Sequence, residues 1–431
     1  MMITLLLALV AMTGQAQIVC HVEGELMTDE YGDEFIICEE GTDLRVNDNP
    51  SLHVKAVNGK FSKTIECDHI TKYEVYPADD KYRSVSFYAE NGTVRIKFHA
   101  EQIPIVESDG EEWLKKKTFD RLLQNHLNEQ FGDYNAITDF FYSRENRSEL
   151  FTADFQNSMV ILNQELANEY KKGNKGDQAR IDSLTRVIVQ RYESPDRFTP
   201  QGLELFNKVE AIDDAWEDFK CQYYDDHPLL ESLYETLDAF TKLRFSDGDI
   251  NFKPQRYERI IALYHDKLHN YFPGHPLHEQ IALAEAGYNL QPGKPYIDYN
   301  VRNTDGQLVP ISSLMKGKVA LIDLWASWCL PCRRHSVAMI PVYEKYKDQG
   351  FTVIAIARQD SREEMEKAMK QDGYPWPSLL ELKDENQVWR KNGADNAGGL
   401  MILVDRDGTI LSTSTDAKEL EPIIKKALDI K

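Results

Sequence analysis

The stretch "LIDLWASWCLPCRRH", from Leu321 to His335, decides the fold of the last third of the chain. It contains the end of an apolar run, "VALIDLWA", which is typical of a strand buried in the centre of a sheet. Two cysteines, Cys329 and Cys332, follow at once with only two residues between them. The segment from Cys329 to Tyr346 is predicted to be helical, so the pair lies where a buried strand passes into a helix.

The start of a helix favours a reactive sulfur on Cys329. Backbone N–H groups are free there and the helix dipole adds partial positive charge, so the thiolate is favoured over the thiol. Cys332 lies about one turn further along, near enough to form a disulfide with Cys329. Pro331 suits the first turn, where its missing N–H costs little. The segment can therefore present a nucleophile, Cys329, and a resolving thiol, Cys332.

Other uses of a closely spaced cysteine pair fit this sequence less well. A structural zinc site needs a second pair of ligands, and the other four cysteines lie far upstream. Covalent haem attachment needs His directly after the second cysteine, where this chain has Arg333. A structural disulfide is the serious alternative outside the cytoplasm, although a bond across two residues removes little chain entropy. We therefore predict a redox-active pair that needs neither a metal nor another cofactor.

A single acid, Asp323, interrupts the apolar strand that precedes the cysteines. A buried carboxylate without a charged partner is costly, so its pKa should be raised. From a position beneath the dithiol, Asp323 could relay a proton to and from Cys332. The alternative is an ion pair with a lysine such as Lys318, and the two roles do not exclude each other.

The sequence that follows "QPGKP", at residues 291–295, alternates strand and helix patterns. "FTVIAIA" is typical of a second buried strand, and "SREEMEKAMKQ" of a helix opened by a capping box between Ser361 and Glu364. "LMILVDRDGTILST" predicts a hairpin that turns at Asp405 to Gly408, and an amphipathic helix ends the chain. This order predicts an α/β domain with a mixed sheet.

The regions upstream have different patterns of apolar and polar residues. The whole chain is therefore predicted to be a multi-domain α+β protein. Residues 17–105 are predicted to form a β-sandwich-like domain, with hairpins turning at Asn58-Gly59 and Asn91-Gly92. Residues 106–290 carry apolar positions at helical spacing and are predicted to form a helical region. The α/β domain takes up residues 291–431.

The segment "IDLWASWCLPC" resembles the active-site segment of thioredoxins. The longer stretch from "NTDGQLVPISSL" through "GFTVIAIA" to "LMILVDRDGTIL" resembles the TlpA/ResA-like branch of secreted thiol-disulfide oxidoreductases in the thioredoxin superfamily. The resemblance covers residues 291–431 and implies a thioredoxin fold there. The layout, with a β domain and a helical region in front, is similar to periplasmic proteins of Bacteroidetes-type bacteria.

The same resemblance implies which side chains surround the cysteines. Trp325 and Trp328 would form a wall of the active site, and Trp328, Leu330 and Pro331 would contact the substrate. The family has a cis-proline facing the cysteines, and alignment on "LMILVD" places Gly399 there. Because a cis bond without proline is costly, this departure bears on how the substrate backbone is held and on how metal is excluded.

A second departure is the basic run that follows the cysteines, Arg333-Arg334-His335. Positive charge near Cys329 would stabilise its thiolate, favour the reduced form and make the pair more oxidising. The alternative is that both arginines point to solvent and pair with nearby acids.

The first residues, 1–16, are predicted to be a secretory signal, with a short apolar run and the small residues of a cleavage site. The predicted location is therefore the periplasm, where disulfides persist. A lipid anchor at Cys20 is not expected, because Val19 before it is larger than a lipoprotein cleavage site prefers. Cys20, Cys38, Cys67 and Cys221 are predicted to be structural, with a disulfide among the first three left open.

These observations predict a secreted thiol:disulfide oxidoreductase that reduces or exchanges disulfides in protein partners. A membrane electron donor would be needed if it works as a reductant, and a homodimer is compatible with the sequence. A net charge of -21 argues against nucleic acid as a partner. Two alternatives stay open: a binding or assembly protein with a vestigial disulfide, and a thiol peroxidase, which ranks third because "SWCLPC" lacks a peroxidatic loop.

Overall fold

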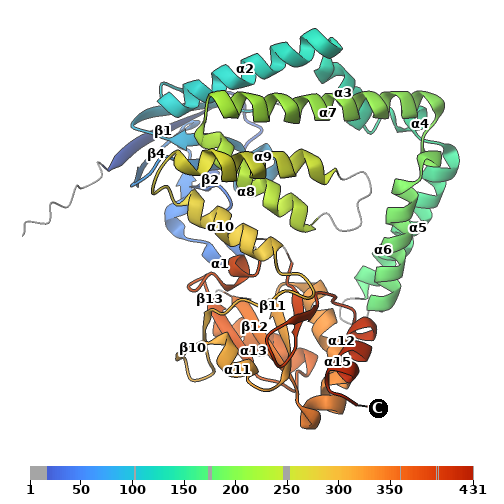
Figure 1. Ribbon diagram of the computed structural model, residues 1–431. Helices are drawn as coiled ribbons and strands as arrows, with labels where there is room; N and C mark the ends of the chain where they lie inside the picture. The colour runs from blue at the N-terminus through green and yellow to red at the C-terminus, as the bar shows by residue number, and fades with distance from the viewer. Residues whose placement is uncertain are drawn as a thin grey trace, which may run out of the picture. The chain divides into compact units, whose positions relative to one another are not determined.

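A computed structural model describes residues 17–100, 103–172, 177–245, 253–359, 361–394, 396 and 398–430 (Figure 1). The expected signal segment, residues 1–16, lies outside this part of the chain. The chain divides into two compact units, and each is described by itself. One contains the residues up to Thr42 together with Asn49–Thr118. The other contains Asp43–Asp48 and Phe119–Lys431.

The first unit is built on two four-stranded sheets. The first sheet has the order β4-β1-β7-β8 and the second β3-β2-β5-β6. Side chains from both sheets, among them Val22 of β1 and Phe35 of β2, belong to one hydrophobic core. The strands are β1 (Ile18–Leu26), β2 (Glu34–Glu39), β3 (His53–Lys55), β4 (Lys60–Cys67), β5 (Thr71–Pro77), β6 (Val85–Ala89), β7 (Gly92–Phe98) and β8 (Ile105–Ser108), with 3-10 turns at Pro50–Leu52 and Lys81–Arg83.

The first predicted hairpin is confirmed only at its turn, where Val57 and Lys60 form an antiparallel pair around Asn58-Gly59. The second is wrong, because β6 and β7 do not pair with each other among the described strands. Asn58 and Gly59 have positive φ angles, yet the flanking strands β3 and β4 belong to different sheets. Asn91 lies between β6 and β7, Gly92 is the first residue of β7, and these two strands also belong to different sheets. β1 pairs antiparallel with β4 and parallel with β7. An alternating strand can pair along either edge, so local sequence does not reveal which neighbour it takes.

The second unit begins with a long helical region, as the apolar spacing predicts. Its helices, with the short helix α1 (Leu44–Asn47) from earlier in the chain, are α2 (Glu111–Phe131), which starts in the first unit, α3 (Tyr134–Tyr142), α4 (Arg147–Leu150), α5 (Ala153–Lys171), α6 (Gln178–Glu193), α7 (Pro200–Asp226), α8 (Leu230–Phe245), α9 (Pro254–Asp266) and α10 (Leu277–Tyr288), with 3-10 turns at Pro195–Arg197 and Leu268–Asn270. Among the described residues, none of the helices is both long enough and apolar enough to cross a membrane.

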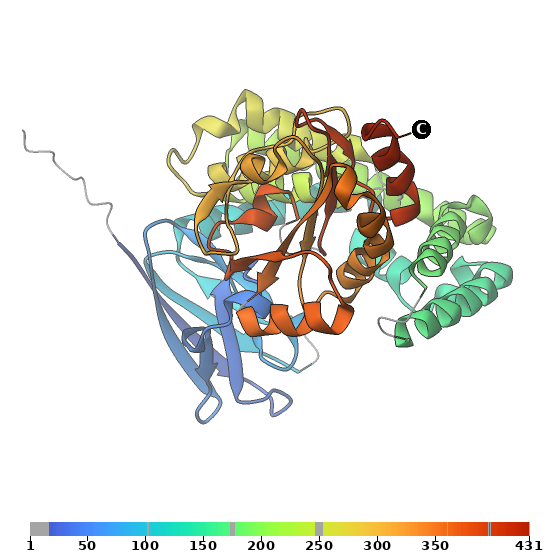
Figure 2. The ribbon, with the colours of Figure 1, turned by 90° about the horizontal axis from the view of Figure 1, so that it is seen from below.

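The C-terminal part is an α/β fold around a five-stranded mixed sheet of order β13-β12-β11-β14-β15. Figure 2 shows α12 and α15 on one side of this sheet and α13 on the other. The elements are β9 (Asn300–Arg302), β10 (Leu308–Pro310), α11 (Ile311–Met315), β11 (Val319–Trp325), α12 (Leu330–Tyr346), a 3-10 turn at Lys347–Gln349, β12 (Phe351–Gln359), α13 (Arg362–Asp372), β13 (Ser378–Leu382), α14 (Val388–Lys391), β14 (Met401–Val404), β15 (Ile410–Ser412) and α15 (Ala417–Ala427).

The central strand β11 positions the cysteines. All seven of its residues are buried, because it has neighbours on both edges and helices over both faces. The predicted hairpin of β14 and β15 is present, and Gly408 N–H donates to the carbonyl of Asp405 in its turn. Ser361 is the N-cap of α13, but its side chain makes no capping hydrogen bond, so the predicted capping box is wrong.

Candidate functional site

The cysteine pair lies at the start of α12, directly after the carboxyl end of β11. Cys329 is the N-cap residue, and Cys332 lies in the first turn. The two are joined by a disulfide with their Cα atoms 5.4 Å apart. Cys332 N–H points at Cys329 Sγ, at 3.4 Å. A backbone N–H aimed at this sulfur, at the positive end of a helix dipole, favours a thiolate on Cys329 once the disulfide is reduced.

The acid of β11, Asp323, is fully buried near this turn. Burial raises its pKa from 3.8 to about 7, and a hydrogen bond from Ser336 offsets part of that rise. Ser336 Oγ lies 2.7 Å from Asp323 Oδ2. The described side chains place this serine, and not Lys318, against the carboxylate. A carboxyl with a pKa close to neutral can both take and return a proton under physiological conditions.

Ser336 is a functional candidate that the sequence reasoning missed. It lies four residues after Cys332, on the same face of α12, and its hydroxyl also lies 3.0 Å from the carbonyl oxygen of Cys332. The hydroxyl therefore links Asp323 to the turn that carries the resolving cysteine. The i,i+4 spacing was available in the sequence, but the partner on β11 becomes visible only when the helix is packed on the sheet.

Replacing Ser336 with Ala is expected to raise the pKa of Asp323 further, by about one unit, because the hydrogen bond that favours the carboxylate is lost. The carboxyl ¹³C shift of Asp323, followed against pH by NMR, measures this directly. Ser378→Ala is the matched control, since the Ser378 hydroxyl accepts from Trp325 Nε1 and has no bond to Asp323. An unchanged Asp323 titration in Ser336→Ala would contradict the hydrogen bond from Ser336 to the Asp323 carboxylate.

Gly399 lies beside the disulfide, as the alignment predicts for the position of the cis-proline. The peptide bonds of the described residues, including the one between Gly398 and Gly399, are trans. The N–H of Gly399 donates to Cys332 Sγ at 3.0 Å. A Cβ at this position would lie 1.8 Å from the carbonyl oxygen of Leu324, so the fold admits only glycine here without rearrangement.

The other predicted contact residues are placed differently from one another. Trp328 is half-buried beside Cys329, and Leu330 is half-buried while Pro331 is exposed. Trp325 is completely buried and donates its indole N–H to Ser378 Oγ at 3.0 Å. Trp325 therefore belongs to the core, and the expectation that it lines the active-site wall is wrong.

A residue far away in the sequence, Arg45 near the start of α1, covers Trp328. Its guanidinium carbon lies 3.9 Å from the centroid of the indole ring, and its Nη2 donates to the carbonyl of Asn396 at 3.0 Å. Asp43 orients Arg45 with two side-chain hydrogen bonds and also pairs with the buried Arg358 at 2.8 Å. Arg45 thus bridges Trp328 and the loop before Gly399, which no local sequence signal indicated.

The side chains of the basic run after the cysteines contact residues from other parts of the chain. Arg333 donates two hydrogen bonds to Asp372, whose side chain is almost completely buried. Arg334 is buried with its guanidinium 5.1 Å from the ring centroid of Tyr170. Burial lowers the pKa of His335. Arg333 therefore pairs with an acid, as the alternative expects, but neither arginine points to solvent, since the Arg333 side chain is 13% exposed and Arg334 is buried.

The upstream cysteines are free thiols in this structure, so the disulfide left open among Cys20, Cys38 and Cys67 is not formed. Burial raises the pKa of Cys20, Cys38 and Cys221 to about 11. Thiols with such pKa values are mostly protonated near neutral pH and react slowly. Their environment agrees with a structural role.

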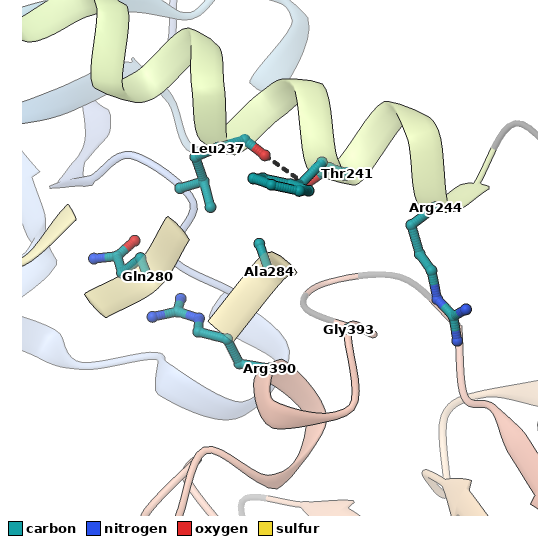
Figure 3. A pocket seen from close by; sticks show the side chains of 8 residues that line it. Leu237, Thr241, Arg244, Gln280, Ala284, Arg390 and Gly393 are labelled. Atoms are coloured by element: carbon teal, nitrogen blue, oxygen red, sulfur yellow. Dashed lines mark hydrogen bonds between the residues drawn. The ribbon is translucent and has the colours of Figure 1, made fainter. Parts of the chain in front are cut away.

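A pocket between the helical region and the C-terminal fold is too small for a substrate. It is lined by residues of α8, α10 and α14, among them Thr241, Ala284 and Arg390 (Figure 3). Its volume is about 30 Å³, which is room for a water molecule or so. Beside it, α10 and the loop after α14 approach so closely that a Cβ on Gly287 would lie 2.4 Å from the Cα of Gly393. The two backbones leave no space for a side chain here, so this contact offers no group for chemistry.

Comparison with known proteins assigns the domain that carries the cysteines. The AhpC/TSA family profile matches residues 292–412. Residues 292–412 are an AhpC/TSA-family domain of thioredoxin fold. The AhpC/TSA domain is similar to the thiol-disulfide oxidoreductase ResA of Bacillus thuringiensis (strain Al Hakam), 26% identical over 142 residues, which is 32% of this chain and 79% of that protein. ResA of Geobacillus kaustophilus (strain HTA426) is 29% identical over 118 residues, 27% of this chain and 65% of its own length.

Solved structures match about a third of the chain. A thiol:disulfide interchange protein DsbE from Chlorobium tepidum is 28% identical, with a TM-score of 0.29, covering 32% of this chain and 99% of its own. The thioredoxin domain of a thiol-disulfide oxidoreductase from Bacteroides vulgatus is 25% identical, with a TM-score of 0.29 and coverage of 32% and 97%. The family match and the ResA relatives confirm the resemblance predicted from the sequence and support the prediction of an oxidoreductase.

Proposed function

We propose that the AhpC/TSA domain exchanges disulfides with protein partners through Cys329 and Cys332. One observation carries the proposal: the disulfide lies at the N-terminus of α12, and Ser336 connects the turn of Cys332 to the buried carboxyl of Asp323. A bond that only stabilised the fold would need neither a helix N-terminus nor an acid with a pKa of about 7 behind it.

The reaction follows from these positions. In the reduced protein the thiolate of Cys329 attacks a partner disulfide, forms a mixed disulfide and expels the partner's second sulfur as a thiolate. Cys332 gives its proton to the Asp323 carboxylate and attacks Cys329 Sγ, so that the bond to the partner breaks and the internal disulfide forms. The partner gains two electrons and the cysteine pair loses two. Exchange in the opposite direction oxidises the partner by the same steps.

Because the reaction exchanges disulfides, its substrates would be disulfide-containing proteins of an oxidising compartment. The predicted secretory signal places the chain in the periplasm in this proposal. There a reductase must be recharged, and a membrane electron donor would supply the electrons. Trp328 and Leu330, both half-buried beside Cys329, are the expected contacts for the partner chain.

Two assays on the full chain test the proposal. We expect the protein to accelerate reduction of insulin disulfides by dithiothreitol and to leave hydrogen peroxide unconsumed in the same buffer. Peroxide consumption without insulin reduction would replace the proposal with the thiol peroxidase alternative. If neither reaction is accelerated and mild dithiothreitol leaves the Cys329–Cys332 bond intact in the folded protein, the disulfide is structural and the chain acts by binding.

A further inference from the structure

The contact between the Gly399 N–H and Cys332 Sγ, at 3.0 Å, gives the resolving cysteine a hydrogen-bond donor that a proline could not supply. We propose that this N–H is a catalytic group: it stabilises the thiolate of Cys332 in the mixed-disulfide intermediate and so speeds release of the partner. The inference rests on the proposed disulfide exchange and names a further group for that reaction.

The surrounding backbone holds the donor in place. Leu324 N–H donates to the carbonyl of Leu400 at 2.9 Å, which ties the segment after Gly399 to the end of β11. A Cβ on Gly399 would lie 1.8 Å from Leu324 O and 2.9 Å from Cys332 Sγ. The neighbouring Gly398 has open space where its Cβ would be. Of these two glycines, only Gly399, whose N–H donates to Cys332 Sγ, has no space for a side chain.

The resolving step is where such a donor matters. In the mixed disulfide Cys329 is bonded to the partner, and Cys332 must lose its proton before it can attack Cys329 Sγ. Cys332 is only 5% exposed, so water stabilises its thiolate poorly. A neutral thiol accepts a hydrogen bond weakly, whereas a thiolate accepts it strongly. The N–H consequently favours the ionised form that attacks.

Three titratable groups lie in or next to the turn that carries Cys332. Cys329 belongs to the same turn and is uncharged while it is bonded to the partner. Asp323 on β11 is connected to the turn through Ser336 and receives the Cys332 proton in the proposed reaction. Burial raises the pKa of Tyr374, near Ser336 and Asp323, so that its hydroxyl stays neutral. The Gly399 N–H differs from these three groups because it does not titrate and donates directly to Cys332 Sγ.

The experiment measures ionisation of Cys332 in the Cys329→Ser background, which leaves Cys332 unpaired as in the mixed disulfide. The ¹³Cβ shift of labelled Cys332 is followed against pH. Gly399→Pro in this background is expected to lower the acid dissociation constant of Cys332 about ten- to hundredfold, the range for a lost hydrogen bond to a charged group. Gly398→Ala is the matched control and should change it less than about twofold. An unchanged constant in a folded Gly399→Pro variant overturns the proposal.

A second measurement needs no change at Gly399 and covers the case in which the proline variant does not fold. In ¹⁵N-glycine-labelled Cys329→Ser protein, the Gly399 amide proton should move downfield with the same midpoint as the Cys332 titration, while the amide of Gly398 does not follow it. A Gly399 amide that ignores this titration overturns the proposal. Neither measurement uses a substrate. A negative result would therefore overturn the role of the Gly399 N–H without affecting the proposed disulfide exchange. A negative insulin assay would overturn disulfide exchange without affecting the measured ionisation of Cys332.

Discussion

Replacing Cys329 with Ser is expected to lower the rate of insulin reduction about a thousandfold or more. A serine hydroxyl stays protonated at neutral pH and cannot form a mixed disulfide, so the reaction loses its nucleophile. Cys329 is the N-cap of α12, and Ser is a favoured residue at that position, so the helix should be retained. Turbidity of the precipitating insulin chain, recorded with dithiothreitol as the electron source, measures the loss.

The matched control is Cys221→Ser, which changes a buried free thiol on α7. Its insulin reduction rate should stay within about twofold of the unchanged protein, because its thiol has no part in the exchange. Comparable activity in Cys329→Ser and in the unchanged protein would contradict the assigned nucleophile. Cys332→Ser should behave differently again, since it leaves the attack intact and traps the mixed disulfide.

The second large effect is a gain in stability, which is expected when the buried carboxyl of Asp323 is removed at high pH. The pKa of Asp323 is about 7 in the folded protein against 3.8 for an ordinary Asp, so between these values the folded state holds a proton that the unfolded state has released. The contribution of this carboxyl to stability is full below pH 3.8 and is lost as the pH rises to about 7. The loss amounts to about 4 kcal/mol.

Asp323→Asn is therefore expected to raise the free energy of unfolding of the C-terminal domain by up to about 4 kcal/mol at pH 8, with little effect below pH 4. Four of the six tryptophans lie in this domain, so tryptophan fluorescence during urea unfolding reports on it. The same variant should reduce insulin more slowly, because Cys332 loses its proton acceptor. Equal stability gains at low and high pH would point to packing and contradict the titration.

Local patterns in the sequence predicted most of the C-terminal elements, although not the capping box at Ser361. The buried run of β11, the helix that starts at Cys329 and the hairpin after Gly399 were all predicted from local spacing. The turns at Asn58-Gly59 and Asn91-Gly92 show the limit of that approach. The turn at Asn58-Gly59 is closed by the pair of Val57 and Lys60. The strands on either side of both Asn-Gly sequences nevertheless pair with other neighbours, because pairing depends on competition between edges that lie far apart in sequence.

The candidate site shows the same division. Cys329 and Cys332 were recognised from their spacing, and Asp323 from being the only acid in an apolar strand. The contacts of Arg45 with Trp328 and of Arg333 with Asp372 join positions too distant for any periodicity to connect. The second of these contacts neutralises a charge that sequence reasoning had counted near the thiolate.

Gly399 lies between these cases. Alignment placed it opposite the cysteines, but the sequence presented it only as the absence of a proline. Because Gly399 has the N–H that proline lacks, it can donate a hydrogen bond to Cys332 Sγ. This contact is visible only in the folded structure.

The most direct test of the central claim is a redox titration of the folded, full-length protein with glutathione, in which the thiol content of Cys329 and Cys332 is read by alkylation and mass spectrometry. We expect one reversible two-electron transition with a reduction potential between about -270 and -120 mV, the interval spanned by thioredoxin-fold exchange proteins. A bond that is reduced only when the domain unfolds, or that does not re-form on reoxidation, would contradict a redox function for this pair.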